Sequence, residues 1–487
     1  MQMSVPIEVR TVAGALRDAG FEAYLVGGCV RDMLMGRKPK DWDVTTNATP
    51  EEIQKVFPES FYENDFGTVG VKVETEDETL RVIEVTPYRT ESGYTDKRRP
   101  NEVFFGQSLE EDLARRDFTV NAIAYDESKG HLVDPYKGQK DLESKVLRTV
   151  RDPRERFEED GLRLMRAVRF VAELGLALDA ETAAGIQEKS LNLSHISKER
   201  IRDEFVKLLK SEQPMMGVVL CQQLGLLEYI APDLPRGIGV DQNQAHSYDV
   251  FEHNLRSLQH AADKGWDLNL RLSALFHDIS KPETRRWSDE KKDWTFHGHE
   301  VVGGRVAKKA LENLKFSRET IEKVSKMVRW HMFFSDPDQV TLSAVRRTIR
   351  NIGEENIEDL LNLRACDRIG TGRPKEQPFR FRKYKAMVEE ALRDPISVGM
   401  LKTDGNRLMS QFHVEPGPKI GWVLNALLEE VLEDPKKNTE KYLDEKTEEY
   451  LKLSDKELKD LGEAGRKKKE EKEEEALKEI LKKHYVS

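Results

Sequence analysis

The sequence predicts an α+β protein, with a mixed β-sheet in the first 150 residues and helices in the remainder. Between residues 20 and 150, short runs rich in β-branched residues alternate with polar turns, which is typical of strands. Beyond residue 150, apolar residues recur every three to four positions, for example at Leu164, Val168 and Val171, which indicates the buried face of a helix. The 487 residues are enough for about three domains.

Composition excludes several classes of protein. The chain is 34% charged, and no stretch approaches the roughly 20 consecutive apolar residues of a membrane-spanning helix. Its first residues contain no apolar signal core. The three cysteines lie far apart, which excludes a disulfide framework and a zinc finger and favours a reducing compartment. We therefore expect a cytoplasmic protein that does not bind membranes. The net charge of -10 leaves nucleic acid open as a partner, because local charge decides such binding.

Changes in sequence pattern divide the chain into five expected segments. The mixed-sheet segment covers 1–150, and a helical segment, 151–235, ends at a Pro-rich joint. The segment 236–375 contains seven of the eleven histidines, and the segment 376–440 is again helical. The last segment, 441–487, has 13 cationic and 14 anionic residues and few apolar ones, so we expect a charged helix or a mobile tail there.

The most informative stretch is AYLVGGCVRDMLMGRKPKDWDVTT. In it, Gly27 and Gly28 stand between an expected strand and an expected helix, where glycine lets the backbone approach a phosphate and the helix start supplies free N–H groups. Further on, Asp41 and Asp43 occupy alternate positions of extended chain, so their side chains point to the same face. Two neighbouring carboxylates repel each other unless a divalent cation lies between them, as in two-metal phosphoryl-transfer sites.

The order GG, RD and DxD resembles the nucleotidyltransferase signature of the DNA polymerase beta superfamily. LVGGCVRD and KDWDVTT are similar to class II tRNA nucleotidyltransferases, the CCA-adding enzymes, and to bacterial poly(A) polymerases. Further blocks follow in the same order, and the resemblance covers about residues 20–230. It implies a nucleotidyltransferase (DNA polymerase beta-like) head, then an all-helical neck, body and tail. It also implies that tRNA is bound by shape and phosphate contacts, with 376–440 contributing.

The resemblance assigns roles to residues of the head. It implies that Asp41 and Asp43 are catalytic and hold Mg²⁺, and that Gly27, Gly28 and Arg31 hold the triphosphate. In the block SLEEDLARRDFTVNAIAYD, the Arg–Asp pair corresponds to residues that recognise ribose and triphosphate in the family. The candidates in this block are Arg116, Asp117 and Asn121.

A second block, FEEDGLRLMRAVRF, predicts how a base is read. Glu159, Asp160 and Arg163 are three and four residues apart, so we expect them on one helix face. Aspartate only accepts hydrogen bonds and arginine only donates them. Cytosine and adenine offer both an amino donor and a ring-nitrogen acceptor, whereas guanine and uracil would leave both side chains unpaired, at about 1–3 kcal/mol. The EDxxR motif of the family has this role, and we add Arg166 of the same helix to the nucleotide-binding candidates.

The expected reaction is the template-independent addition of CCA to the 3′ end of tRNA from CTP and ATP. Between Val85 and Pro100 lies an expected loop, TPYRTESGYTDKRRP, whose counterpart in the family is needed for the switch from CTP to ATP. Three alternatives stay open: an A-adding tRNA nucleotidyltransferase, a poly(A) polymerase, and an HD phosphohydrolase with a nucleotide-binding head. The oligomeric state also stays open.

The histidine-rich segment has its own resemblance. The order H…HD…D resembles the HD phosphohydrolase superfamily. Two imidazoles and two carboxylates suit a divalent transition metal, which turns a bound water into a nucleophile. His297 is an alternative to His299 in this set. The resemblance implies a metal site formed by His253, His277, Asp278 and Asp367, with His299 and His331 as ligands of a second metal, and phosphohydrolase activity there is a hypothesis.

Overall fold

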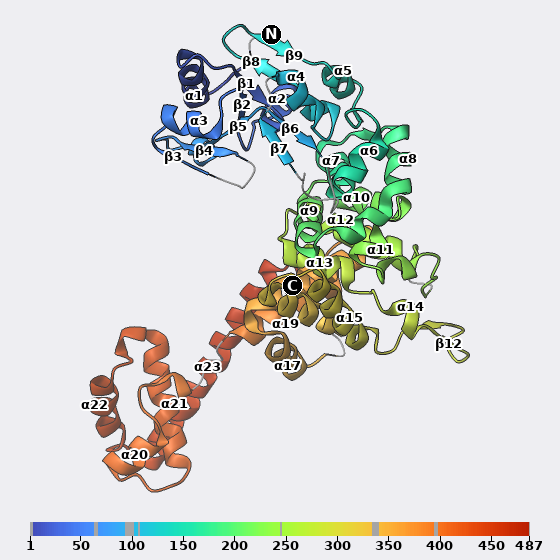
Figure 1. Cartoon of the computed structure of the whole chain (residues 1–487). Coiled ribbons are helices and arrows are strands. Elements are labelled where there is room, and N and C mark those ends of the chain that lie inside the picture. Colours follow the sequence, from blue (N-terminus) through green and yellow to red (C-terminus); the bar gives the residue numbers. More distant parts are fainter. Residues whose placement is uncertain are drawn as a thin grey trace. The chain divides into compact units, whose positions relative to one another are not determined.

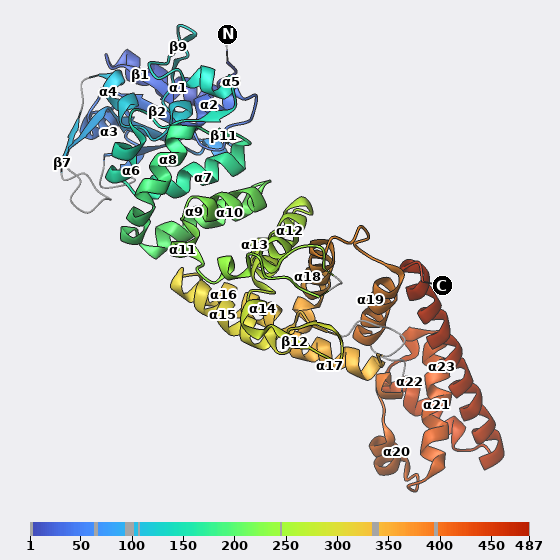
Figure 2. The same ribbon diagram turned by 90° about the vertical axis from the view of Figure 1, so that its right-hand side faces the viewer.

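The computed structural model describes residues 3–62, 67–92, 102–105, 108–243, 246–333, 340–393 and 398–486. The chain forms two compact units. The first comprises Met1–His331 and Asn362–Pro374, and the second comprises Met332–Leu361 and Lys375–Ser487. Residues 332–361, which the expected segment 236–375 includes, thus pack with the second unit. Figures 1 and 2 show the elements of both units from two directions.

A seven-stranded mixed sheet forms the head, as predicted. Its strand order is β3-β4-β5-β2-β1-β8-β9, in which β2 and β5 are parallel and the other neighbours are antiparallel. The helices α1 (Ile7–Asp18) and α3 (Pro50–Val56) lie beside this sheet (Figure 1) and share its apolar core. The strands are β1 (Ala23–Val26), β2 (Asp43–Thr46), β3 (Ser60–Tyr62), β4 (Val69–Lys72), β5 (Val82–Pro87), β8 (Ala124–Asp126) and β9 (His131–Val133).

The strand β2 carries the predicted carboxylates at its beginning. Asp43 is its first residue, and Asp41 lies two residues earlier, in a bend that leads into the strand. Trp42 between them is only 3% exposed and packs into the core of the sheet, whereas Asp41 is exposed and Asp43 is half-buried. This alternation agrees with the expectation that the two carboxylates share the face opposite the tryptophan.

A small hairpin occupies part of the expected loop between Val85 and Pro100. Residues Arg89–Ser92 form β6, which pairs in antiparallel fashion with β7, Glu102–Phe105. The prediction of a loop throughout this stretch was therefore wrong for residues 86–87, which end β5, and for residues 89–92. The extended TES sequence finds a pairing partner ten residues further on that local turn composition does not reveal. The rest of the expected loop, residues 93–100, lies outside the described residues.

The helices of the first unit share one continuous apolar core. That core runs from Phe118 beside the sheet, through Val168 and Phe205, to Leu275 and Val328. The helices that contribute to this core include α6 (Pro153–Glu159), α7 (Leu162–Leu174), α8 (Ala180–Lys189), α9 (Lys198–Lys210), α10 (Pro214–Gln223), α12 (Val250–Asp263), α13 (Leu268–Phe276), α15 (His299–Asn313) and α16 (Arg318–Trp330). The first unit also contains α4 (Leu109–Ala114) and, from Asn362 on, α18 (Ile357–Gly370). Within the described residues, no helix is long and apolar enough to cross a membrane.

The charged C-terminal segment is part of the second unit. Where we expected one charged helix or a mobile tail, residues 441–487 contain most of α22 (Glu440–Tyr450) and all of α23 (Asp455–Lys483). The helix α23 packs along α21 (Pro418–Glu433), as Figures 1 and 2 both show. A Cβ on Gly465 would lie 2.2 Å from the Asn425 carbonyl oxygen, so glycine is what permits this close approach. The other helices of this unit include α17 (Leu342–Ile352), α19 (Phe379–Leu392) and α20 (Gly405–Phe412).

Candidate functional site

The glycine turn after β1 lies directly beside Asp43 and Arg116. Gly27 has φ 74° and caps the N-terminus of α2 (Gly28–Leu34). A Cβ at this position would lie 3.0 Å from Arg116 Nη1 and 3.3 Å from Asp43 Oδ2, so both the backbone angle and the space require glycine. The structure thus brings together three residues predicted from the sequence: Gly27, Asp43 and Arg116. The guanidinium of Arg116 lies beside the turn that a phosphate would approach.

Two acidic residues of this site escaped the sequence analysis. Glu84 in β5 is the register partner of Asp43 in β2, so the two side chains stand next to each other on one face of the sheet. Asp112 is completely buried and forms ion pairs with Arg115 at 2.5 Å and Arg116 at 3.1 Å. The i, i+3 and i, i+4 spacing of Asp112 to the two arginines was the available signal.

The buried carboxylate of Asp112 remains ionised. Burial alone would raise its pKa, but the guanidinium groups of Arg116 and Arg115 hold the pKa of Asp112 below its ordinary value. Its Oδ2 also lies 3.4 Å from the hydroxyl of Thr45 in β2. Asp112 therefore connects β2 to the arginine beside the glycine turn and fixes where that arginine points.

Four further candidates form a chain of hydrogen bonds from α2 to α7. Arg31 is 8% exposed and donates to Asp32 Oδ1 at 2.8 Å and to Asn121 Oδ1 at 2.9 Å. Asn121 donates to Asp117 Oδ1 at 3.1 Å, and Arg166 pairs with Asp117 Oδ2 at 2.6 Å. Burial would raise the pKa of Asp117, but the charge of Arg166 and the hydrogen bond from Asn121 lower it to about 2. Asp32 and Asn121 therefore hold the side chain of Arg31, and Asn121 and Arg166 orient the carboxylate of Asp117.

The predicted base-reading residues do not lie on one helix. The helix α6 ends at Glu159, Asp160 leaves the helix with φ -139° and ψ 108°, and α7 begins at Leu162. The expectation of a single helix face was wrong because Asp160 acts as a cap, its Oδ1 accepting the N–H of Leu162 at 2.9 Å. Regular spacing in the sequence could not reveal this break, since Gly161 follows the aspartate and tolerates either conformation.

The same three residues nevertheless lie together at the break between α6 and α7. Glu159 pairs with Arg163 at 2.5 Å, and Arg163 also donates to the carbonyl oxygen of Arg115 at 3.1 Å. Asp160 pairs with Arg200 of α9 at 3.0 Å. Arg200 therefore holds the acceptor Asp160, and Glu159 holds the donor Arg163. The bond to the Arg115 carbonyl also connects Arg163 to the head.

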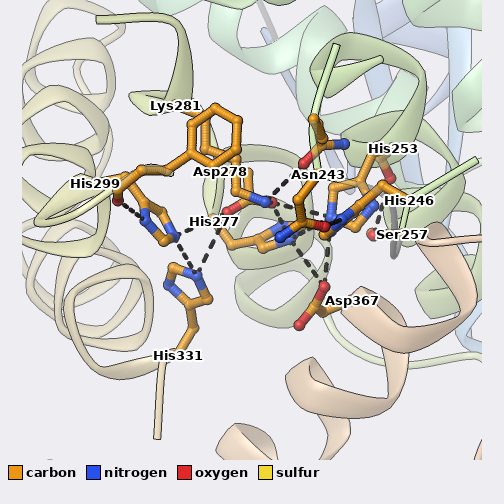
Figure 3. A network of polar contacts seen from close by, with 12 residues as sticks. Asn243, His246, His253, Ser257, His277, Asp278, Lys281, His299, His331 and Asp367 are labelled. Carbon is orange, nitrogen blue, oxygen red and sulfur yellow. Dashed lines mark hydrogen bonds and ion pairs between the residues drawn. The ribbon is translucent and has the colours of Figure 1, made fainter. Parts of the chain in front are cut away.

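A second site lies in the helical part of the first unit (Figure 3). Its centre is Asp278, whose Oδ2 lies 3.0 Å from His253 Nε2 and whose Oδ1 lies 3.2 Å from His299 Nε2. The cluster is buried. The six ligands predicted from the sequence all meet here: His253 in α12, His277 and Asp278 directly after α13, His299 at the start of α15, His331 at the end of α16, and Asp367 in α18.

The backbone orients three of these imidazoles. The Nδ1 atoms of His277, His299 and His331 lie 2.7 to 2.8 Å from carbonyl oxygens three residues earlier in the chain. Each Nδ1–H therefore donates outward, and each Nε2 faces the cluster, as in metal-ligating histidines. Burial would lower the pKa of His277, but the carboxylates of Asp278 and Asp367 raise it to about 10, so a metal bound there would displace a proton. The Nε2 atoms of His299 and His331 are 3.3 Å apart, so two acceptors face each other. A cation between them would relieve this repulsion.

The donor set fits a divalent metal ion. The ligand atoms of His246, His253, Asp278 and Asp367 lie within 4.8 Å of one another, and so do those of Asp278, His299 and His331. Neither buried oxygen of Asp278 has a hydrogen-bond partner of good geometry. Burial lowers the pKa of His331 to about 4, and burial with the nearby charge of Lys281 lowers that of His246 to about 3. Neutral imidazoles with free lone pairs are the form that binds metal.

Two details of this cluster were not predicted correctly. His297 is exposed, so it is excluded as the alternative to His299. His246 joins the cluster although the sequence analysis did not include it, and the signal that could have found it was a histidine seven residues before His253 in the same block. Lys281 was missed as well: its Nζ lies 2.5 Å from Asp278 Oδ2.

Comparison with known proteins agrees with both sites. Residues 23–148 match the family described as Poly A polymerase head domain, residues 175–236 match the probable RNA and SrmB-binding site of polymerase A, and residues 250–369 match the HD domain. The chain is 32% identical to the CCA-adding enzyme of Pediococcus pentosaceus, over 88% of this chain and 94% of that one. It belongs to the family of CCA-adding enzymes and related tRNA nucleotidyltransferases.

Other members of the family resemble parts or all of the chain. The CCA-adding enzyme of Geobacillus sp. (strain WCH70) is 46% identical, but this match spans 44% of the chain and about half (52%) of that relative. The A-adding tRNA nucleotidyltransferase of Deinococcus radiodurans is 33% identical over 84% of this chain and 91% of that enzyme. Among solved structures, the Bacillus stearothermophilus CCA-adding enzyme in complex with CTP is 26% identical, with a TM-score of 0.59 over 92% of this chain and 100% of that one.

The membership confirms the sequence-based predictions of family and fold class. The mixed-sheet nucleotidyltransferase head, the helical remainder and the HD domain are all present. The Thermotoga maritima CCA-adding enzyme complexed with tRNA, at 18% identity and a TM-score of 0.51 over 91% of this chain, shares the fold. The chain is therefore a nucleotidyltransferase by family.

Proposed function

We propose that this enzyme adds CCA to the 3′ end of tRNA, using CTP and ATP and releasing pyrophosphate. The observation that carries the proposal is the match to a CCA-adding enzyme over 94% of that relative's length, together with the convergence of Gly27, Asp43 and Arg116 in the head. In this proposal, 1–150 carries the catalysis, 151–235 reads the base, and 376–440 contacts tRNA. A cytoplasmic location agrees with three buried cysteines that form no disulfide.

The chemistry of the head needs divalent cations, and its donors suit them. Asp41 and Asp43, with hard carboxylate oxygens, would hold Mg²⁺, which supplies charge stabilisation at the transferring phosphate. Glu84, the neighbour of Asp43 in the sheet, adds negative charge at the same place. Arg116 stands over the glycine turn in the orientation set by Asp112, so it binds and orients the triphosphate.

The neck supplies nucleotide selection in this proposal. Asp160 accepts and Arg163 donates, which matches the amino group and ring nitrogen of cytosine and adenine. Arg200 and Glu159 hold the two groups in place, so neither can turn to suit a carbonyl and a ring N–H. Uracil or guanine would leave charged groups unpaired, at about 1–3 kcal/mol for each lost hydrogen bond. Asp117, Asn121 and Arg166 then position the sugar beside this pair.

Extension of a tRNA transcript that ends at the discriminator base tests the reaction. Products are resolved at single-nucleotide length after incubation with CTP, with ATP, with both, and with UTP or GTP as controls. Two additions with CTP and a third that requires ATP are expected. Extension by A only, and only on a transcript ending in CC, would instead establish an A-adding enzyme. Sequence identity does not separate these two, since the two full-length relatives are 32% and 33% identical. Long A tails would indicate a poly(A) polymerase.

We further propose that the HD cluster binds a divalent transition metal. His253, His277, Asp278 and Asp367 would hold one cation, and Asp278 would share its second oxygen with a site formed by His299 and His331. Such an ion lowers the pKa of a bound water, and the buried cluster favours hydrolysis of a phosphoester as a second activity. Metal analysis of the purified protein tests the binding. Asp41→Ala should abolish nucleotide addition and leave any hydrolysis intact, whereas His277→Ala should do the reverse.

A further inference from the structure

The ring of Phe170 is contacted by three arginine side chains inside the first unit. Phe170 lies in α7 and is only 4% exposed. The guanidinium carbon atoms of Arg31, Arg166 and Arg169 lie 5.2, 5.4 and 4.0 Å from the centre of its ring. These distances are within the range of about 6 Å in which the face of an aromatic ring attracts a cation. One buried apolar side chain therefore meets three positive charges.

Two of these arginines are the two ends of the hydrogen-bond chain that runs from α2 to α7. Arg31 of α2 donates to Asn121, and Asn121 donates to Asp117. Arg166 of α7 pairs with the other oxygen of the same carboxylate. Because both end groups also contact Phe170, its ring closes the chain into a loop. Polar bonds join the head to the neck on one side of this loop, and the aromatic ring joins them on the other.

The third arginine fixes the ring from the side of the neck. Arg169 is buried and pairs with Glu204 of α9 at 2.6 Å and with Glu173 of its own helix at 2.8 Å. The ring of Phe118 meets that of Phe170 at an interplanar angle of 83°, with centroids 5.7 Å apart, which is a favourable edge-to-face contact. The ring of Phe170 is therefore held in one position before any ligand binds.

An aromatic ring suits this position for a reason that an aliphatic side chain does not share. A guanidinium is planar and its N–H bonds lie in that plane, so its face can stack on a ring but cannot donate a hydrogen bond. Arg31 is only 8% exposed, so the protein has to supply the group that faces it. The negative face of the ring stabilises the charge and sets the plane of the guanidinium without consuming an N–H donor. Leucine would fill the space without this attraction.

We propose that Phe170 is a positioning residue for the incoming nucleotide, whose ring holds Arg31 and Arg166 in the orientation that binds it. The inference rests on the proposed nucleotide-binding roles of these two arginines. Phe170 acts through them and not by contact with the reacting atoms. The electron density on the face of the ring, and not only its volume, then sets the affinity for CTP and ATP.

Ring fluorination in the full-length protein tests this assignment. Phe170 is replaced by phenylalanines that carry one, two or three ring fluorines, which nearly keep the shape of the ring but withdraw electron density from its face. The same series at Phe205 is the matched control, because Phe205 is fully buried in the same apolar core. Phe170→Leu is the aliphatic reference. Calorimetry gives the Kd for CTP and ATP, tRNA extension gives kcat and both KM values, and thermal unfolding gives the Tm.

At position 170 we expect the nucleotide Kd and KM to rise with each fluorine, to about fivefold or more with three, while the KM for tRNA stays unchanged. The Tm should change no more than in the Phe205 series. A nucleotide Kd that does not follow the number of fluorines would refute the inference, even if Phe170→Leu is impaired, since packing would then be the whole effect. An equal trend at Phe205 would refute it as well. A wild type that neither binds CTP or ATP nor extends tRNA would instead refute the proposed function, and the inference with it.

Discussion

Asp112 and Arg116 form an ion pair of 3.1 Å behind the Gly27 turn, and the carboxylate of this pair is completely buried. The pair joins α4 to β2, since Asp112 also reaches the hydroxyl of Thr45. Asp112 does not have to contact the phosphate for the pair to matter, because a guanidinium that is already fixed needs less reorganisation in the transition state than a mobile one.

The ion pair should govern nucleotide use. In Asp112→Asn the guanidinium of Arg116 loses its charged partner, so kcat/KM for CTP and ATP should fall about 10- to 100-fold, equivalent to roughly 1.4–2.7 kcal/mol. Steady-state kinetics on a tRNA transcript give this value. Asp203→Asn is the control, because Asp203 is an exposed aspartate that pairs with its neighbour Arg202 at 2.8 Å. An unaltered kcat/KM in Asp112→Asn would show that Arg116 does not act on the triphosphate.

The same variant should change the acid dependence of stability. The folded-state pKa of Asp112 lies below that of the unfolded chain, which is about 3.9. Its stabilising contribution is therefore complete above that pH and is lost as pH falls through the folded-state pKa. The difference in unfolding free energy between wild type and Asp112→Asn, measured by denaturant titration, should be constant near neutrality and shrink below about pH 4.

The glycine turn should not tolerate a side chain. Gly27→Ala places a methyl group 3.0 Å from Arg116 Nη1 and 3.3 Å from Asp43 Oδ2, so nucleotide addition should fall by about 100-fold or more. The control is Gly36→Ala, which has a similar φ of 69° but nothing within 4 Å of its Cβ. Both variants should lose about 1–2 kcal/mol of stability from the left-handed backbone, so an equal loss of activity in both would contradict a site-specific effect.

Base selection should depend on the acceptor-only character of Asp160. In Asp160→Asn the side chain gains an N–H₂ group that can donate to the carbonyl of uracil or guanine. Discrimination of CTP and ATP over UTP and GTP should shrink about tenfold or more, as judged from kcat/KM for each nucleotide. A uniform loss for all four nucleotides would instead indicate that Asp160 is needed for the fold of the neck, through its cap of α7 and its pair with Arg200.

Metal removal should destabilise the helical part of the first unit. Binding of an ion at 100 times its Kd stabilises the native state by about 2.7 kcal/mol, so a chelator should lower the Tm of the wild type. His277→Asn should abolish this chelator effect, because His277 lies at the centre of the cluster. His297→Asn is the matched control and should keep it. A chelator that leaves the wild-type Tm unchanged would count against bound metal.

The contact between α21 and α23 should be sensitive at one glycine. Gly465→Ala would bring a Cβ to 2.2 Å from the Asn425 carbonyl oxygen, and the forced separation of the helices should cost about 1–3 kcal/mol. Gly421→Ala lies in the same helix pair with nothing within 4 Å, and it should raise stability by about 0.5–1 kcal/mol through helix propensity. Chemical denaturation of both variants distinguishes the two effects, and equal values would contradict the packing.

Local patterns in the sequence were sufficient for the parts of the site that local geometry dictates. The alternating burial of Asp41, Trp42 and Asp43 and the glycine turn at the start of α2 both depend on residues that are neighbours in the chain, so both could be predicted residue by residue. The order of histidines and aspartates from His253 to Asp367 likewise indicated the ligand set, because the resemblance to the HD superfamily supplied the long-range partners.

Only the tertiary structure could decide the contacts between residues that are far apart in the chain or that depend on burial. It separated the exposed His297 from the buried His299, and it brought His246 into the cluster. It placed Asp112 behind Arg116, ended α6 at Glu159, and packed the charged α23 against α21. Sequence periodicity reports which face of an element is apolar, but burial and pairing are set by what other elements place against that face.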